Sequence, residues 1–163
     1  MAINIRHHIA NITTNNNNND CWAVSTAMVM HRHSMHGTDH VKALANLARV
    51  PLDQAGSLPD SSVRSFANAV HLGFHDFQNT TLTMGKLESL LRRGPVVAFG
   101  FFNYPGVQAS LKHAVAIYAL IGNGTERGTK VYLMDPASAA NPFSDDWQHF
   151  DASVADITFV LSH

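Results

Sequence analysis

Cysteine is almost missing from this sequence, which has one, Cys21, among 163 residues. A single cysteine forms no internal disulfide and supplies no zinc site built from several cysteines. Charge is also scarce, because 14% of the residues are charged, compared with about 25% in typical domains. With a formal net charge of -1, the chain has no positive excess to hold a polyanion, so we expect no nucleic-acid binding.

Long apolar runs and a secretory signal are missing as well. No stretch approaches the roughly 20 apolar residues that span a bilayer, so we expect no membrane insertion. The N-terminal segment MAINIRHH lacks a basic region followed by an apolar one, so no classical signal peptide is expected. We therefore expect the chain to be cytoplasmic at synthesis. The sequence leaves open its export by a secretion system that recognises another kind of signal.

Apolar residues are abundant enough to build a sizeable core. They make up 45% of the chain, which argues against disorder over most of its length. A chain of this length fits one hydrophobic core, and no linker or internal repeat divides it. We expect a single domain over residues 1–163, acting as a monomer.

The first half of the chain has the pattern of helices. After an extended lead-in and an asparagine loop at residues 15–19, Asp20 is a good N-cap for the first helix. Apolar spacing, caps and terminators predict helices at about 21–35, 39–49, 61–72 and 83–93. Gly37 is expected to end the first of these helices.

The second half changes to the pattern of strands. Compact apolar runs predict strands at 96–102, 113–121, 130–134 and 157–161. Glycines between the second and third strands, at 122, 124 and 128, favour an antiparallel hairpin. Helices followed by strands predict an α+β fold with an N-terminal helical half and a small C-terminal antiparallel sheet.

Three residues capable of nucleophilic or acid–base chemistry fall at the ends of these elements. Cys21 begins the first helix, where the N–H groups of the first turn favour a thiolate. His113 begins one hairpin strand and Asp135 ends the other, so a hairpin would bring them side by side. The imidazole could serve a thiolate as general base and acid, with Asp135 fixing its tautomer. Singly, each residue also fits a structural role: a buried cysteine, a strand-end histidine and an Asp-Pro turn.

At these residues the sequence resembles the papain-like cysteine peptidases. Cys21-Trp22-Ala23-Val24-Ser25 is similar to the motif that begins the family's central helix, and Lys112-His113-Ala114-Val115-Ala116 to its His-Ala-Val-Ala stretch. Asp135-Pro136 resembles the compact bacterial branches, which include bacteriocin-processing peptidase domains and papain-fold effector proteases of plant pathogens. The resemblance implies a papain-like fold and a Cys21–His113–Asp135 triad that hydrolyses peptide bonds through an acyl-enzyme, with no cofactor and no metal.

The asparagine loop is where the sequence departs most from that family. The family places a glutamine six residues before the nucleophile, and its side chain helps to form the oxyanion hole. Here Asn15 occupies that position, so the resemblance implies Asn15 as the oxyanion donor, with Asn16 as an alternative. The same run can also be a flexible loop. The papain tryptophan that shields the third triad member has no counterpart near Asp135, and Trp147 could replace it only if its loop folded back.

Other functions remain compatible with the same residues. A deamidase, an isopeptidase or a transglutaminase-like enzyme would use the same triad, and a degenerate fold would bind a peptide without catalysis. The resemblance implies a protein or peptide substrate and a role as a bacterial effector or toxin, with an immunity or inhibitor protein as a further partner.

The remaining candidates are weaker. Histidine is frequent, with eleven in the chain, and His31, His33, His36 and His40 form its densest cluster. A helix broken at Gly37 would separate His36 from His40, so we expect no functional metal site.

Aromatic and acidic residues near the predicted strands have simpler interpretations. The aromatic stretch of Phe99, Phe101, Phe102 and Tyr104 suits core packing. The segment Phe102-Asn103-Tyr104-Pro105-Gly106, however, is typical of a loop before His113, and its aromatic residues could shape a substrate pocket. Asp145 and Asp146 are expected in a solvated turn.

Overall fold

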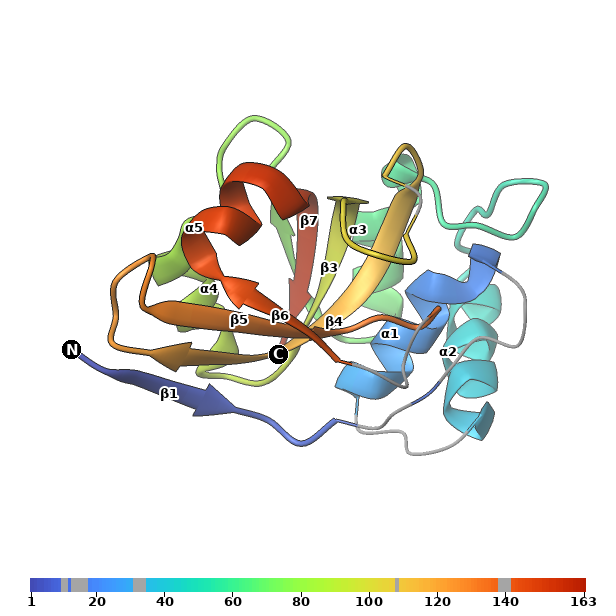
Figure 1. Cartoon of the computed structure of the whole chain (residues 1–163). Helices are drawn as coiled ribbons and strands as arrows, with labels where there is room; N and C mark the ends of the chain where they lie inside the picture. Colours follow the sequence, from blue (N-terminus) through green and yellow to red (C-terminus); the bar gives the residue numbers. More distant parts are fainter. Residues whose placement is uncertain (10–11, 13–17, 31–34, 108, 138–141) are drawn as a thin grey trace.

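An antiparallel sheet of seven strands lies between two groups of helices (Figure 1). The computed structural model describes residues 1–9, 12, 18–30, 35–107, 109–137 and 142–163. In chain order the elements are β1 (Ile3–Arg6), η1 (Asn18–Asp20), α1 (Cys21–Val29), α2 (Met35–Leu47), α3 (Asp60–Ala69), β2 (Gly73–Asp76), α4 (Met84–Leu91), β3 (Val96–Phe102), β4 (Lys112–Gly122), β5 (Thr129–Met134), β6 (Phe143–Asp146), α5 (Trp147–His149), η2 (Phe150–Val154) and β7 (Ala155–Ser162). These helices and the antiparallel sheet confirm the expected α+β class.

The long strand β4 organises the sheet. The strand order is β2-β7-β3-β4-β5-β6, and β1 also pairs with β4. The first half of β4 pairs with β3, and its second half pairs with β1 on one edge and β5 on the other. The predicted antiparallel hairpin is therefore confirmed as β4–β5. Its open end carries the start of β4 and the end of β5.

Side chains alternate between two cores, one on each face of the sheet. On β3, Val97 and Phe99 join the core formed with α1, α2 and α3, whereas Val96 and Ala98 join the core formed with α4, α5 and η2. Because both faces are covered, β3 and β4 consist mainly of apolar residues rather than alternating polar and apolar ones. This explains why the sequence pattern detected them.

Helix α1 lies against β4, with nearly every side chain buried. Trp22 packs edge-on against Phe66 of α3, with the ring centroids 5.0 Å apart. The hydroxyl of Ser25 donates a hydrogen bond of 2.9 Å to the carbonyl oxygen of Ala114 on β4. Ala23 and Ala27 are fully buried, and such small side chains permit close packing of a helix on a strand. The helix is thereby held against the strand that carries His113.

The first helix is shorter than predicted. It ends at Val29, and Gly37 lies inside α2 rather than at the end of α1, so that prediction is wrong. Gly37 is tolerated because it lies in the first turn of α2, where N–H groups have no intrahelical acceptor.

Three strands were not predicted. Strand β1 falls in the segment that was expected only as an extended lead-in. Strands β2 and β6 are each four residues long and carry polar residues, so neither has a clear apolar pattern. Asp145 and Asp146 were expected in a solvated turn but lie on β6, opposite Val131 and Lys130 of β5. Asp146 then caps α5 by accepting a 3.0 Å hydrogen bond from the His149 backbone N–H.

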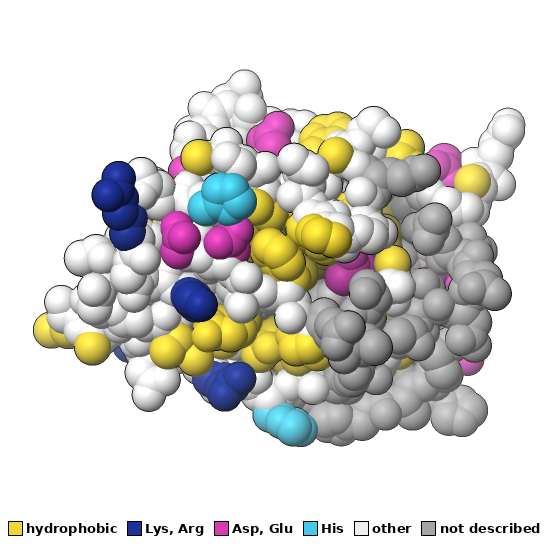
Figure 2. Space-filling view, in the orientation of Figure 1, with side chains coloured by type: hydrophobic (Ala, Val, Ile, Leu, Met, Phe, Trp, Pro, Cys, Tyr) yellow, Lys and Arg dark blue, Asp and Glu magenta, His cyan; other side chains and the backbone are white. Residues whose placement is uncertain are grey.

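The surface reflects the low content of charged residues. On the face in Figure 2, apolar side chains are visible between scattered charged ones. In the part of the chain that the structure describes, no helix is long and apolar enough to cross a bilayer.

Candidate active site

Cys21 is the first residue of α1 and lies at the edge of a cleft. Its neighbour Trp22 is anchored by a 3.2 Å hydrogen bond from its indole N–H to the carbonyl oxygen of Gly56. Asp20 occupies the predicted N-cap position, but its carboxylate makes no capping hydrogen bond. It pairs instead with the ammonium of Lys42 on α2, at 2.5 Å. The start of the helix is thus held by tertiary contacts rather than by a side-chain cap.

The open end of the β4–β5 hairpin brings His113 and Asp135 together. The ring Nε2 of His113 lies 2.7 Å from Oδ1 of Asp135. The Cys21 thiol lines the same cleft as this ring, and its proximity helps to raise the pKa of His113. Because Nε2 faces Asp135, Nδ1 is the ring nitrogen that remains for the thiol. The three residues predicted from the sequence therefore form one connected group.

The imidazole is held in its charged form. Burial alone would lower the pKa of His113, but hydrogen bonds to Asp135 and Cys21 and the charges of both groups raise it to about 9. Burial likewise opposes ionisation of Asp135, yet the His113 contact and two further hydrogen bonds lower its pKa below the usual value. The arrangement favours an imidazolium next to a carboxylate at neutral pH.

Tyr104 is a buried partner of Asp135 whose role the sequence did not reveal. Its hydroxyl donates a hydrogen bond of 2.7 Å to Oδ2 of Asp135, and the backbone N–H of Ala137 donates one of 2.7 Å to Oδ1. Burial and the Asp135 carboxylate raise the pKa of Tyr104, which keeps the phenol a donor. The Tyr104 ring stacks on Phe143, with centroids 4.7 Å apart.

The sequence analysis placed Tyr104 in the loop before His113 but predicted a different role for it. We expected it to shape a substrate pocket, and the structure instead turns its hydroxyl to Asp135. A loop tyrosine carries no sequence pattern that distinguishes the two roles.

The cleft next to Cys21 has a volume of about 380 Å³. One wall comes from the loop before α3 and the start of α3, and the other from β3, β4 and the connection between them. Lys112, next to His113, forms an ion pair with Asp60 at the start of α3. This pair joins the two walls. Asn19 also lines the cleft, and its side-chain oxygen accepts a 3.3 Å hydrogen bond from the Ser57 hydroxyl.

Other predicted residues lie elsewhere or outside the described part. Asn15 and Asn16, the candidate oxyanion donors, lie outside the described residues, as do His31 and His33. Trp147 packs against Phe150 in the core on the α4 side of the sheet. Within the described residues, no group of three or more histidines, cysteines or acidic residues could hold a metal ion.

Two aromatic residues of β3, Phe99 and Phe102, lie near the site in different surroundings. Phe99 lines the cleft, whereas Phe102 is fully buried, with its ring edge-on to the His113 ring at 6.4 Å between centroids. Phe102 also packs against Tyr104, with ring centroids 6.2 Å apart. One aromatic side chain thus contacts both the histidine and the tyrosine that holds its carboxylate partner.

Comparison with known proteins agrees with the predicted papain-like fold. A comparison with curated proteins returns no match. A protein-family model described as papain-like cysteine protease AvrRpt2 matches residues 3–152, which include Cys21, His113 and Asp135. Because this match spans most of the sequence, the chain belongs to the papain-like cysteine proteases of the AvrRpt2 family.

Proposed function

We propose that this cysteine protease hydrolyses peptide bonds with Cys21 as nucleophile, His113 as general base and acid, and Asp135 as the residue that orients the imidazole. The observation that carries the proposal is the connected group of thiol, imidazole and carboxylate at the edge of the cleft, with His113 and Asp135 2.7 Å apart. The raised pKa of His113 supports a thiolate–imidazolium pair before substrate binds.

The reaction would proceed in two steps through an acyl-enzyme. The Cys21 sulfur attacks the carbonyl carbon of the scissile amide, and the imidazolium of His113 donates its proton to the nitrogen of the leaving amine. Water then attacks the thioester, and His113 accepts a proton from it. The intermediate collapses to a carboxylic acid, which loses its proton to solvent, and Cys21 is restored as a thiolate next to a protonated His113. Asp135 keeps the ring oriented throughout and stabilises its charge.

The oxyanion of each tetrahedral intermediate needs donors near Cys21. We propose the backbone N–H of Cys21 and the side-chain amide of Asn15 for this role. The amide of Asn15 carries the same donor group as the family's glutamine on a side chain one methylene shorter. The start of α1 supports the backbone part of the proposal, because first-turn N–H groups point out of a helix.

Labelling of Cys21 tests whether the thiol is activated. We expect a peptide carrying a thiol-reactive electrophile to modify Cys21 much faster than it modifies free cysteine, because His113 favours the thiolate. His113→Ala should bring the rate close to that of free cysteine. Equal rates for wild type and His113→Ala would contradict the proposed pair.

Replacement of the nucleophile tests the chemistry itself. We expect Cys21→Ala to abolish cleavage and leave the thermal unfolding midpoint nearly unchanged, because a partly exposed thiol contributes little to packing. Mass spectrometry of a digested peptide library measures the products. New peptide termini indicate hydrolysis, whereas a mass gain of about one unit without cleavage indicates a deamidase. Full turnover by Cys21→Ala would rule the mechanism out.

The biological setting is also a proposal. We propose one papain-like domain over residues 1–163, because both cores share one sheet, and a monomer that acts as an effector or toxin inside another cell. The resemblance to the compact bacterial peptidases supports this role. A protein or peptide would be the substrate, and an immunity or inhibitor protein would be a further partner. Size-exclusion chromatography of the protein alone tests the monomer.

A further inference from the structure

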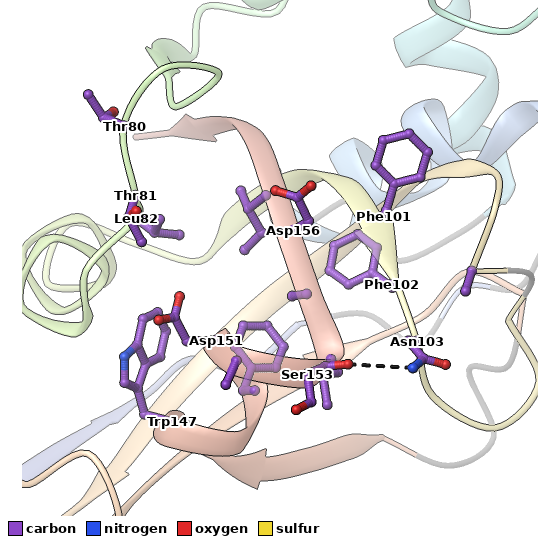
Figure 3. A pocket seen from close by; sticks show the side chains of 16 residues that line it. Thr80, Thr81, Leu82, Phe101, Phe102, Asn103, Trp147, Asp151, Ser153 and Asp156 are labelled. Carbon is purple, nitrogen blue, oxygen red and sulfur yellow. Dashed lines mark hydrogen bonds between the residues drawn. The ribbon is translucent and has the colours of Figure 1, made fainter.

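A second cavity lies apart from the cleft and has a volume of about 510 Å³. Figure 3 shows it between the chain at Thr80–Leu82 and strand β7, with Trp147 and Asp151 at one end. No described residue lines both cavities. The connection between β3 and β4 nevertheless contributes to each: Gly106 and Val107 line the cleft, and Asn103 and Ala109 line this cavity.

The charged side chains among the described residues that line this cavity are acidic. Asp151 and Asp156 are the only charged side chains among the described residues that line it, and neither belongs to an ion pair formed within the described part of the chain. Burial and the neighbouring carboxylate of Glu126 raise the pKa of Asp151. Lys112 lies over the Phe101 ring, but its ammonium is paired with Asp60 in the cleft. A positively charged group would therefore find unpaired carboxylates here.

One edge of strand β7 faces the same cavity. Strand β2 pairs with β7 from Phe159 to Ser162, and the hydrogen bond from Phe77 N–H to the Thr158 carbonyl oxygen, at 2.8 Å, closes that pairing. The preceding residues, Ala155 to Ile157, pair with β3 on one side and line the cavity. An extended peptide can add to such a strand edge, with its alternate side chains turned to one face.

We propose that this cavity is an exosite for an extended basic segment of the protein substrate, with lysine or arginine side chains paired to Asp151 and Asp156 and its backbone along the first half of β7. The proposal rests on the proposed peptidase function, because the occupant is part of a chain whose scissile bond lies in the cleft. The β3–β4 connection supports this, because it contributes residues to both the cleft and the cavity.

Binding to the inactive Cys21→Ala protein tests the site without any turnover. The probe is a fluorescein-labelled peptide, Ser-Arg-Ser-Lys-Ser-Arg-Ser, in which the basic side chains share one face of an extended chain. We expect it to bind, and expect the Asp151→Asn/Asp156→Asn protein to bind about tenfold more weakly by fluorescence anisotropy. The Asp39→Asn/Glu88→Gln protein changes net charge equally at residues outside the cavity lining and should bind like the parent.

Three results of this measurement would overturn the exosite. The first is equal binding of a peptide with glutamate in place of every basic residue, and the second is equal weakening by the two charge-matched variants. The third is competition by free arginine at the same molar concentration as the peptide, which would assign the cavity to small cations. A probe with methyl groups on alternate backbone nitrogens tests strand addition. We expect it to bind more weakly, because pairing with the strand edge needs those N–H groups. Unchanged affinity would exclude strand addition.

A kinetic comparison connects the site to the substrate. A peptide that the enzyme cleaves in the library digest is extended with the basic segment and, separately, with a serine-only segment. We expect a lower KM for the basic extension in the wild type, and no difference in the Asp151→Asn/Asp156→Asn protein. An equal benefit in both proteins would show that the segment binds elsewhere. A protein that binds the probe but has an unreactive Cys21 would instead refute the proposed function and leave the binding site standing.

Discussion

The hydrogen bond from Tyr104 to Asp135 is the contact at the site that a single substitution can remove most cleanly. Tyr104→Phe deletes the hydroxyl and keeps the ring that stacks on Phe143. The Asp135 carboxylate, which is 3% exposed, then loses one of its donors. A hydrogen bond to a charged group contributes about 1.5–3 kcal/mol, so we expect a loss of that order in the free energy of unfolding.

The same substitution should also move the pH dependence of catalysis. Tyr104 lowers the pKa of Asp135, so its removal should raise that pKa and shift the acidic limb of kcat/KM to higher pH. Denaturant unfolding and a pH–activity profile measure the two effects. A less stable enzyme with an unmoved acidic limb would show that Tyr104 supports the fold but does not position Asp135.

The asparagine loop carries the second prediction at this scale. We expect Asn15→Ala to lower kcat by about 10²–10³ with little change in KM, because an oxyanion donor acts mainly in the transition state. Asn17→Ala and Asn18→Ala should be close to neutral and serve as matched controls. Steady-state kinetics on a cleaved peptide makes the comparison.

Asn19 offers an alternative outcome of that comparison. Its side chain lines the cleft next to Cys21, and its oxygen accepts a hydrogen bond from Ser57. If Asn15→Ala is silent and Asn19→Ala causes the large loss in kcat, the family register is wrong for this loop and the donor lies closer to the nucleophile.

Among the elements, β3 is enclosed on both edges, because it lies between β4 and β7. Gly100 pairs with His113 on one side and Ile157 on the other, at a register shift. A Cβ at this position would overlap the backbone oxygen of Asp156. We expect Gly100→Ala to lower the free energy of unfolding by about 1–3 kcal/mol, the usual range for overpacking. Thermal unfolding measures the change.

A second glycine provides the control for that element. Gly85 lies in α4, where a Cβ would meet no atom within 4 Å. Gly85→Ala should leave the unfolding midpoint unchanged or slightly higher, because alanine favours a helix more than glycine does. Equal stability of the two variants would show that β3 and β7 can separate at no cost.

For the whole molecule, the site links stability to pH. The pKa of His113 is about 9 in the folded protein, compared with an ordinary value of 6.5. A raised folded pKa contributes stability that is fully present below pH 6.5 and is lost as the pH rises through about 9. Asp135 has a lowered pKa, so its contribution is present above its ordinary value of 3.8 and is lost at lower pH.

The alkaline part of this dependence can be isolated with one variant. Between about pH 6 and pH 10, we expect the free energy of unfolding of wild type to fall by about 3 kcal/mol relative to His113→Gln. Urea unfolding at several pH values measures both proteins. Parallel curves over this range would mean that His113 is not held as an imidazolium in the folded state.

The sequence by itself determined the main elements, the fold class and the grouping of Cys21, His113 and Asp135. Helix α1, strands β3 and β4 and the hairpin to β5 are detectable because their apolar pattern and glycine turns are local properties of the chain. His113 and Asp135 are 22 residues apart, yet a hairpin brings them together by its pairing alone. Local pattern does not place Cys21 near His113 and Asp135, and the resemblance to a known family supplied that expectation.

Only the tertiary structure decided the features that depend on distant neighbours. Strands β2 and β6 are short and polar, and they form because β7 and β5 supply partners. The Tyr104–Asp135 bond joins positions 31 residues apart, and the Lys112–Asp60 pair joins positions 52 apart. The second cavity likewise combines residues that are far apart in the sequence, among them Thr80, Asn103 and Asp156. Such contacts arise from how the sheet and helices pack, and no local pattern of side chains encodes that packing.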